Sequence, residues 1–133
     1  MKIILIVILF CISFRLFAPG ISQFCIEKAD PIKPFEKLWD AICKIESNND
    51  SLAFCIDINN SPSVGIAQIQ DCRIRDFNAR TGNNYTLDDM FSPAKAKIVF
   101  MYYCEGDYEH IAKRWNGRGK QTEIYWQKIL KVL

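Results

Sequence analysis

Residues 41–70 read AICKIESNNDSLAFCIDINNSPSVGIAQIQ, and this stretch decides the fold. Its first part ends a helical pattern on a carboxylate, Glu46, and its last part holds a glycine turn, Gly65, followed by Gln68. Before Glu46, apolar side chains recur at helical spacing, which predicts an amphipathic helix over residues 34–47. The apolar face of this helix consists of Phe35, Leu38, Ile42 and Ile45.

Glu46 lies one helical turn after Ile42, at the edge of that apolar face. Nearby apolar surface disfavours the charged form of a carboxyl group, so we expect a raised pKa for Glu46. The negative end of the helix dipole acts in the same direction. A carboxyl group that stays protonated near neutral pH can act as a general acid. The alternative is a glutamate that pairs with a surface lysine, and the helix alone does not separate the two.

The polar stretch after this helix ends it, and residues 52–58 are interpreted as a short extended piece before a turn at 59–63. Gly65 permits a tight backbone beside a bulky neighbour. Gln68 stands between apolar residues, where an amide is costly unless it binds a partner. We expect at most one small strand pair, near residues 52–66.

The second half of the chain predicts further short helices, which start at capping residues. Ser92 with Pro93, Asp107 and Thr122 are such starts, and Thr86 caps a single helical turn. The predicted segments are residues 71–81, 86–90, 93–104, 107–114 and a last helix from residue 122 onward. Together with the first helix they predict a mainly α, or α+β, single domain.

The N-terminal residues are typical of a signal peptide. Lys2 supplies a positive start, residues 3–14 are mostly apolar, and small residues precede residue 23. We expect a signal peptide over residues 1–22, a folded domain over residues 23–133, and an exported protein of the periplasm or cell envelope. An uncleaved N-terminal membrane anchor is the alternative.

Charge and metal-ligand chemistry exclude several function classes. Without residues 1–22 the chain has equal numbers of acidic and basic side chains. No basic excess therefore supports binding to nucleic acid. His110 is the only histidine, and no CxxC pattern is present. We therefore expect no metal site, no cofactor and no Ser-His-Asp or Cys-His centre.

The cysteines suggest disulfide chemistry in an exported chain. Five of the six cysteines lie after residue 22, and an odd number leaves one thiol free or paired with another chain. Cys55 and Cys72 flank Gly65, and we hypothesise that they form a disulfide that closes this turn. Mass mapping of oxidised peptides would test the pairing.

Five short elements follow one another over residues 35–133. They are a helix that ends in Glu-Ser, a Gly-x-x-Gln-Ile turn, a tyrosine at a helix end, an aromatic-Asn-Gly loop and a tyrosine in the final helix. In this sequence the elements are Glu46-Ser47, Gly65-Ile66-Ala67-Gln68-Ile69, Tyr103-Cys104, Trp115-Asn116-Gly117 and Tyr125. In this order they resemble the SLT-type lytic transglycosylases, which share a goose-lysozyme-like fold.

Three positions depart from the pattern of that family. Ala67 stands in place of a methionine, Trp115 in place of a loop tyrosine, and Phe100 where a glycine is frequent in the buried helix. The aromatic wall survives at Trp115 but its hydroxyl is lost. These departures affect the expected shape of the groove, and so the length of the substrate, more than the chemistry.

The resemblance implies a lysozyme-like domain that cleaves the β-1,4 bond between N-acetylmuramic acid and N-acetylglucosamine in peptidoglycan. Glu46 would be the catalytic acid and base, and the product would be a 1,6-anhydro sugar. The resemblance also implies that Ser47, Gln68, Ile69 and Asn116 contact the glycan. Tyr103, Trp115 and Tyr125 would stack on sugars or close the groove, although a core role for Tyr103 and Tyr125 is the competing interpretation.

Other functions remain open at this point. A hydrolytic lysozyme of the same fold would use Asp50 or Asp57 to position a water molecule. A glycan-binding subunit of a secretion apparatus would not need Glu46, and a small disulfide-bonded binding protein would not need the Glu-Ser and Gly-x-x-Gln pair. We expect a monomer that acts on peptidoglycan strands. By analogy, it could open the wall for an envelope-spanning secretion or conjugation complex, which assembly of such complexes after deletion of the protein would test.

Overall fold

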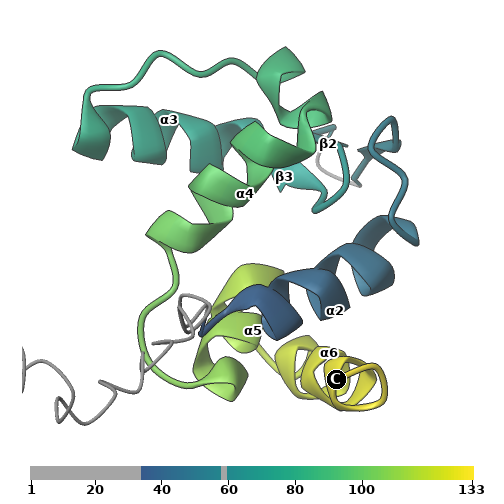
Figure 1. The fold of residues 1–133 in the computed structure, drawn as a ribbon. Helices are drawn as coiled ribbons and strands as arrows, with labels where there is room; N and C mark the ends of the chain where they lie inside the picture. Colours follow the sequence, from purple (N-terminus) through teal and green to yellow (C-terminus); the bar gives the residue numbers. More distant parts are fainter. Residues whose placement is uncertain (1–33, 58–59) are drawn as a thin grey trace, which may run out of the picture. The chain divides into compact units, whose positions relative to one another are not determined.

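The computed structural model describes residues 34–57 and 60–133. They belong to one folded unit, Lys33–Leu133. The predicted signal peptide over residues 1–22 and the lead-in after it lie outside the described residues. Within the described part, the chain is mainly helical and carries one small antiparallel sheet (Figure 1). This confirms the mainly α or α+β class.

The first described helix, α2 (Glu36–Ser47), confirms the helix predicted over residues 34–47. Its inner face buries Leu38, Trp39 and Ile42 almost completely. It ends because Asn48 adopts the left-handed conformation, with φ of 57°, and its backbone N–H returns to the carbonyl of Lys44. Helix α2 therefore ends at Ser47, one residue after Glu46, which leaves this carboxylate at a helix end.

The sheet has three strands rather than one pair: β1 (Phe54–Ile56), β2 (Pro62–Val64) and β3 (Ile69–Gln70). All neighbours are antiparallel in the order β1-β2-β3. The turn predicted over residues 59–63 is thus too long, because β2 begins at Pro62. Proline is tolerated there because it occupies the first residue of its strand.

Gly65 forms the tight turn after β2, and it does so beside the 3-10 helix η1 (Asp88–Phe91). Its φ is +74°, and a Cβ on this residue would lie 2.0 Å from the carbonyl oxygen of Met90. Both the conformation and the close approach require glycine. The backbone of this turn therefore packs directly against the backbone of η1 at Met90.

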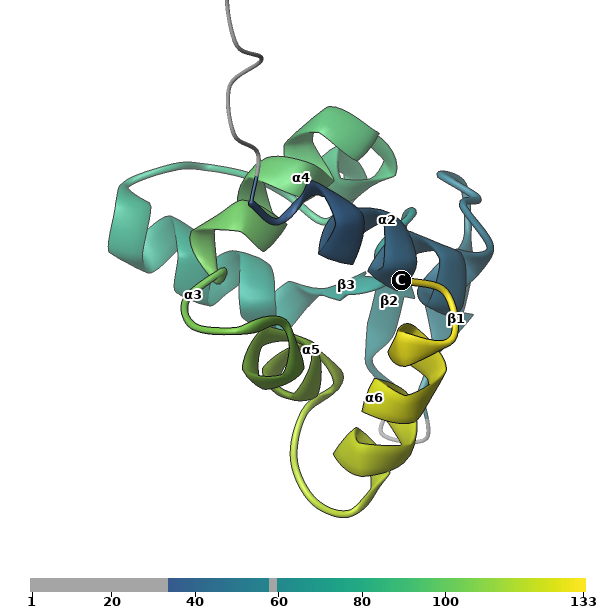
Figure 2. The same cartoon turned by 60° about the horizontal axis from the view of Figure 1, so that its bottom comes forward.

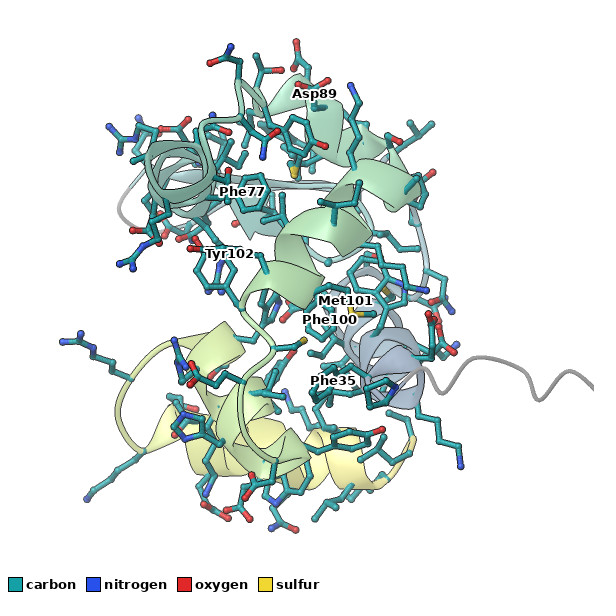
Figure 3. The ribbon with its side chains drawn as sticks, turned by 60° about the vertical axis from the view of Figure 1, so that its left-hand side comes forward. Phe35, Phe77, Asp89, Phe100, Met101 and Tyr102 are labelled. Atoms are coloured by element: carbon teal, nitrogen blue, oxygen red, sulfur yellow. The ribbon has the colours of Figure 1, made fainter. Side chains whose placement is uncertain are left out.

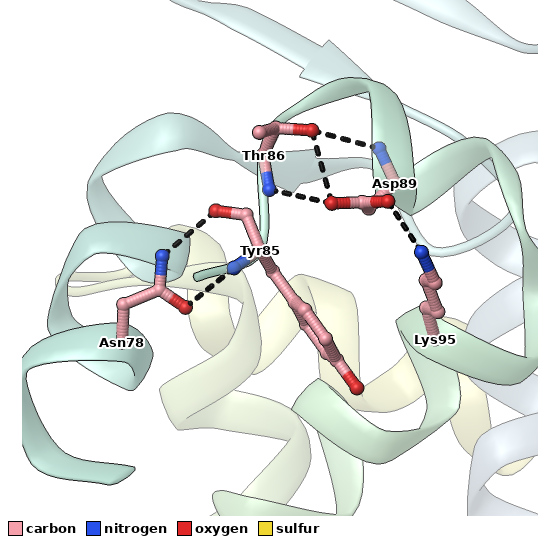
Figure 4. Close-up of polar contacts among 5 residues, drawn as sticks. All are labelled: Asn78, Tyr85, Thr86, Asp89 and Lys95. Carbon is pink, nitrogen blue, oxygen red and sulfur yellow. Dashed lines mark hydrogen bonds and ion pairs between the residues drawn. The ribbon is translucent and has the colours of Figure 1, made fainter. Parts of the chain in front are cut away.

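Helix α3 (Asp71–Thr81) and the segment after it are joined by a polar network (Figure 4). The Asn78 side chain donates to the carbonyl of Tyr85 at 2.7 Å and accepts from its backbone N–H at 3.0 Å. The Asp89 carboxylate accepts from the Thr86 backbone N–H at 2.8 Å and from the Lys95 ammonium at 2.5 Å. These bonds hold the loop between α3 and η1. The helical turn predicted over residues 86–90 is present as η1, but it begins at Asp88, and its N-cap is Leu87 rather than Thr86.

Three more helices complete the chain: α4 (Pro93–Tyr102), α5 (Tyr108–Asn116) and α6 (Gln121–Leu130). Asp107 caps α5 as expected, since its carboxylate accepts from the backbone N–H of His110 at 2.8 Å. Thr122 does not cap α6, because this helix begins one residue earlier. In Figure 2, α5 and α6 lie near α2, and α6 contacts both of these helices.

Phe100 lies at the centre of the core, where it is fully buried (Figure 3). Its ring centroid is 5.2 Å from that of Trp39 in α2 and 5.2 Å from that of Trp115 in α5. A second contact joins Phe77 of α3 to Tyr102 of α4, edge to face at 5.2 Å. Aromatic rings at α4 therefore fill the space between helices, which explains why a large side chain is accommodated at position 100.

The cysteines of the described residues carry free thiols. The hypothesised disulfide between Cys55 and Cys72 is absent, because strand β2 intervenes: Cys55 pairs with Ser63, and Ser63 pairs with Gln70 on the far side. Two strand spacings, about 10 Å, thus separate Cys55 from Gln70, the residue two positions before Cys72, and this exceeds the usual Cα separation of a disulfide. Cys43 is buried, and Cys104 is half-buried.

Among the residues that the structure describes, no helix is both long and apolar enough to cross a membrane.

Candidate active-site cleft

A polar cleft with a volume of about 680 Å³ lies beside the end of α2. Its walls come from α2, the sheet, α3, the end of α4 and the last turns of α5. Five of the residues expected at the site line it, namely Glu46, Gln68, Tyr103, Trp115 and Asn116. The other wall residues are Cys55, Ser63, Gln70, Cys72, Arg73, Asp76, Ile111, Arg114 and Gly117.

Glu46 is the carboxylate that α2 presents to this cleft. Burial raises the pKa of its carboxyl group, because desolvation disfavours the charged form. The hydrogen bond from Tyr125 and the positive charges of Arg73 and Lys128 oppose this rise, and the net direction is upward. Glu46 is therefore suited to hold a proton and to donate it to a bound molecule, as a general acid does.

Tyr125 of α6 forms a hydrogen bond with the Glu46 carboxyl group. Its hydroxyl donates to Oε1 of Glu46 at 2.7 Å, and its side chain is 6% exposed. It is not among the residues that line the cleft. Its place in the structure is therefore beside the carboxylate rather than at the surface a glycan would touch.

The Gly65 turn positions Gln68 in the cleft. Gln68 has a φ of +48°, a conformation that costs about 1–3 kcal/mol for a residue with a side chain. Its amide nitrogen donates to the carbonyls of Gly65 at 3.0 Å and Ala53 at 3.3 Å. These bonds satisfy the NH₂ group and orient the amide, whose oxygen accepts no hydrogen bond from the described residues. This oxygen can accept one from a ligand.

Two residues expected to contact a ligand are placed elsewhere. Ser47 does not line the cleft; its hydroxyl donates to the backbone carbonyl of Ile66 at 2.8 Å, which ties the end of α2 to the Gly65 turn. Ile69 is fully buried, because the inward face of the short strand β3 packs into the core. Both residues shape the cleft wall without facing it.

Tyr103 and Trp115 form an aromatic wall, but a large part of it is occupied by Arg73. The Arg73 guanidinium lies 4.1 Å from the ring centroid of Trp115 and 5.3 Å from that of Tyr103. The Tyr103 hydroxyl donates to Oδ2 of Asp76 at 2.8 Å. Burial, followed by this hydrogen bond, raises the pKa of Tyr103. Only 7% of Trp115 is exposed, whereas Asn116 beside it is exposed.

The two aspartates considered as partners of Glu46 have structural contacts. Oδ1 of Asp50 accepts from the backbone N–H of Leu52 at 2.9 Å, in a turn. Asp57 accepts from the backbone N–H of Ser61 at 2.8 Å and from the amide of Gln70 at 3.4 Å. Neither residue lines the cleft; the second carboxylate there is Asp76. Hydrogen bonds from Arg80 and Tyr103 lower the pKa of Asp76, which favours its charged form.

Sequence reasoning missed Arg73, Asp76 and Arg114. Arg73 and Asp76 are three residues apart on α3, so they share one face beside the buried Ile74 and Phe77. An arginine at the edge of an apolar face was the available signal, but such residues are also common on solvent faces. Over residues 34–57 and 60–133, no group of three or more His, Cys, Asp or Glu side chains could hold a metal ion.

Comparisons with protein-family models, with curated proteins and with solved structures found no significant match for this chain.

Proposed function

We propose that this chain is a lytic transglycosylase with a lysozyme-like domain, which cleaves the β-1,4 bond between N-acetylmuramic acid and N-acetylglucosamine in peptidoglycan. Glu46 serves as both the acid and the base. The observation that carries the proposal is the position of Glu46, a desolvated carboxyl with a raised pKa in the wall of a polar cleft.

The elements that resemble the transglycosylase family support this proposal because they meet around one cleft. Glu46, Gln68, Tyr103 and Asn116 come from separate parts of the chain and line the same space. Tyr125, from the final helix, bonds to Glu46. A set of unrelated sequence coincidences would have no reason to converge in this way.

The mechanism uses one carboxyl group twice. Glu46 donates its proton to the glycosidic oxygen, and the bond between that oxygen and the anomeric carbon of the muramoyl sugar breaks. The Glu46 carboxylate then accepts the proton of the C6 hydroxyl of the same sugar, whose oxygen bonds to the anomeric carbon. Glu46 returns to its protonated form, and no water is consumed. Gln68 and Asn116 orient the sugar with amide hydrogen bonds.

One observation keeps hydrolysis as a second candidate. Asp76 lines the cleft together with Glu46. Most glycoside hydrolases use two carboxyl groups, one on each side of the glycosidic bond. The contacts of Asp76 with Tyr103 and Arg80 favour a positioning role instead. The product distinguishes these roles, because a hydrolase adds water to the muramoyl end.

Mass spectrometry of purified peptidoglycan tests the proposal after incubation with the chain or with Glu46→Gln. Anhydro-muropeptides from the unchanged chain and none from Glu46→Gln are expected. Products heavier by one water that still depend on Glu46 would replace the proposal with a hydrolase. If neither protein yields products, a glycan-binding role without catalysis, as in a subunit of a secretion apparatus, becomes the better explanation.

A further inference from the structure

The cleft holds two arginines that the mechanism above does not use. Arg73 and Arg114 both line it, and neither forms an ion pair with a carboxylate of the described residues. The other arginines of α3, Arg75 and Arg80, are paired with Asp71 and Asp76. On α3, the arginines outside the cleft are thus paired with carboxylates, whereas Arg73, inside the cleft, is not.

Arg73 is held in place by its surroundings. Its guanidinium stacks 4.1 Å from the ring centroid of Trp115 and donates one hydrogen bond, at 3.0 Å, to the Trp115 carbonyl. A guanidinium carries five N–H donors, so most of them remain for another acceptor. The planar group is thus fixed against an aromatic face with donors to spare.

No acidic group of the described residues forms an ion pair with either of these arginines. Asp76 is shared with Arg80, at 2.8 Å, and with the hydroxyl of Tyr103. Glu46 is driven toward its neutral form by burial, which is the form that a general acid needs. Burial lowers the pKa of Arg73, the nearby Tyr103, Cys72 and Glu46 oppose this, and the like charge of Arg114 adds a smaller lowering. With Glu46 protonated, the cleft has an excess of positive charge that an anion would relieve.

We propose that Arg73 and Arg114 form a carboxylate-binding subsite of the cleft, which takes an acidic substituent of the glycan strand. The inference rests on the proposed function and specifies its substrate as an acidic glycan. Arginine suits this task because its fork of donors matches the two oxygens of a carboxylate. In peptidoglycan the carboxylate has two sources, the lactyl group of a muramoyl sugar without its peptide, or the peptide stem.

Binding measured by isothermal titration calorimetry tests the subsite, with the full chain carrying Glu46→Gln so that no ligand is cleaved. The three ligands are a neutral N-acetylglucosamine oligomer, a peptidoglycan strand stripped of its peptides, and the same strand with its peptides. We expect one or both acidic strands to bind more tightly than the neutral oligomer, with an advantage that falls as salt rises. The tighter of the two acidic strands identifies the source of the carboxylate.

Substitutions then assign the effect to the two arginines. Arg114→Gln should weaken binding of the acidic strand by about tenfold, as expected for a charge-assisted hydrogen bond, and leave the neutral oligomer unchanged. Arg73→Gln should do the same, but it also loses packing on Trp115, so its fold is checked by circular dichroism. Arg75→Gln, an exposed arginine on the same helix outside the cleft, should bind all three ligands as the parent does.

The outcomes separate the two proposals. Equal binding of neutral and acidic strands, or unchanged acidic binding in Arg114→Gln and Arg73→Gln, overturns the subsite while the proposed function stands. If no ligand binds and the unchanged chain cleaves no peptidoglycan, the proposed function fails and the subsite fails with it.

Discussion

The hydroxyl of Tyr125 donates a 2.7 Å hydrogen bond to Oε1 of Glu46, across 79 residues of chain. The contact joins the last helix to the end of the first described one. It has two effects on the carboxyl group, since it fixes the position of one oxygen and opposes the rise of pKa that burial causes. The final helix is therefore part of the proposed active site, although it does not line the cleft.

Replacing Tyr125 with phenylalanine removes this hydrogen bond and keeps the ring. The pKa of Glu46 should rise further, because the bond lowers it in the unchanged chain. In the proposed mechanism Glu46 acts as an acid while it is protonated, so the fall of activity at high pH should move to higher pH. We expect roughly a tenfold loss of rate at the optimum pH, because this factor corresponds to the free energy of one hydrogen bond to a charged group.

The pH dependence of glycan cleavage measures this effect. Tyr102→Phe is the matched control, because Tyr102 is 43% exposed and its hydroxyl makes no hydrogen bond to the described residues. A Tyr125→Phe profile that keeps its position, or that moves to lower pH, would contradict the role assigned to Tyr125.

Ionisation of Glu46 should lower the free energy of unfolding at high pH. Its folded-state pKa is raised by burial, so the folded chain holds the proton more tightly than the unfolded chain does. The resulting stabilisation is present at pH below the unfolded-state pKa and is lost as pH rises through the folded-state pKa. Glu46→Gln, which cannot ionise, should therefore melt at higher temperature than the unchanged chain at alkaline pH.

Thermal unfolding followed by circular dichroism over a pH series would measure the difference. At acidic pH, where both proteins are uncharged at position 46, the two melting temperatures should converge. Tyr125 can still donate to the amide oxygen of the variant, so the comparison isolates the charge. If Glu46→Gln is less stable at alkaline pH, then burial is not the dominant influence on this carboxyl group.

The helices could be predicted because their signals are local. The helix start at Ser92-Pro93, the cap at Asp107 and the stop at Gly82 need only neighbouring residues, and the structure confirms the helices that they delimit. The third strand could not be predicted, because β3 has two residues and exists only through its pairing with β2. Such short strands are set by tertiary contacts and carry no period of their own.

A site residue could be predicted where its position in the sequence suggests a single chemical role. Glu46 at the end of an apolar helix face is such a case, and it lines the cleft. Ile69 could not be separated from its neighbour Gln68 by sequence, because the side on which each residue falls depends on the unusual φ of Gln68. Arg73 was missed because its aromatic partner, Trp115, lies 42 residues away in the chain.

Gly65→Ala should disrupt the turn that carries Gln68. Its φ of +74° disfavours any side chain, and the new Cβ would lie 2.0 Å from the Met90 carbonyl oxygen. We expect a loss of about 2–5 kcal/mol in the free energy of unfolding, from backbone strain and overpacking together. Gly82→Ala is the control, because its φ is +73° but nothing lies within 4 Å of the added Cβ.

Urea unfolding of the two variants would separate strain from collision. Gly82→Ala should cost about 1 kcal/mol, the conformational penalty alone. Equal losses in both variants would mean that η1 moves aside for the new methyl group, and that the contact between the turn and Met90 does not constrain the cleft.

The four cysteines of the described residues should divide into two reactivity classes. Cys55 and Cys72 are exposed and line the cleft. Burial raises the pKa of Cys43 and of Cys104 to about 12, so both remain thiols at neutral pH and react slowly. With Cys11 and Cys25 replaced by serine, a thiol reagent should therefore label two sites rapidly, which peptide mass mapping would identify as Cys55 and Cys72.

A bulky label on these residues fills the cleft and should abolish cleavage of peptidoglycan, whereas a methyl label should leave most of the activity. Further replacement of Cys55 and Cys72 by serine should protect the activity from the bulky reagent. Inhibition that persists in this variant would show that the glycan does not need the space between these two residues.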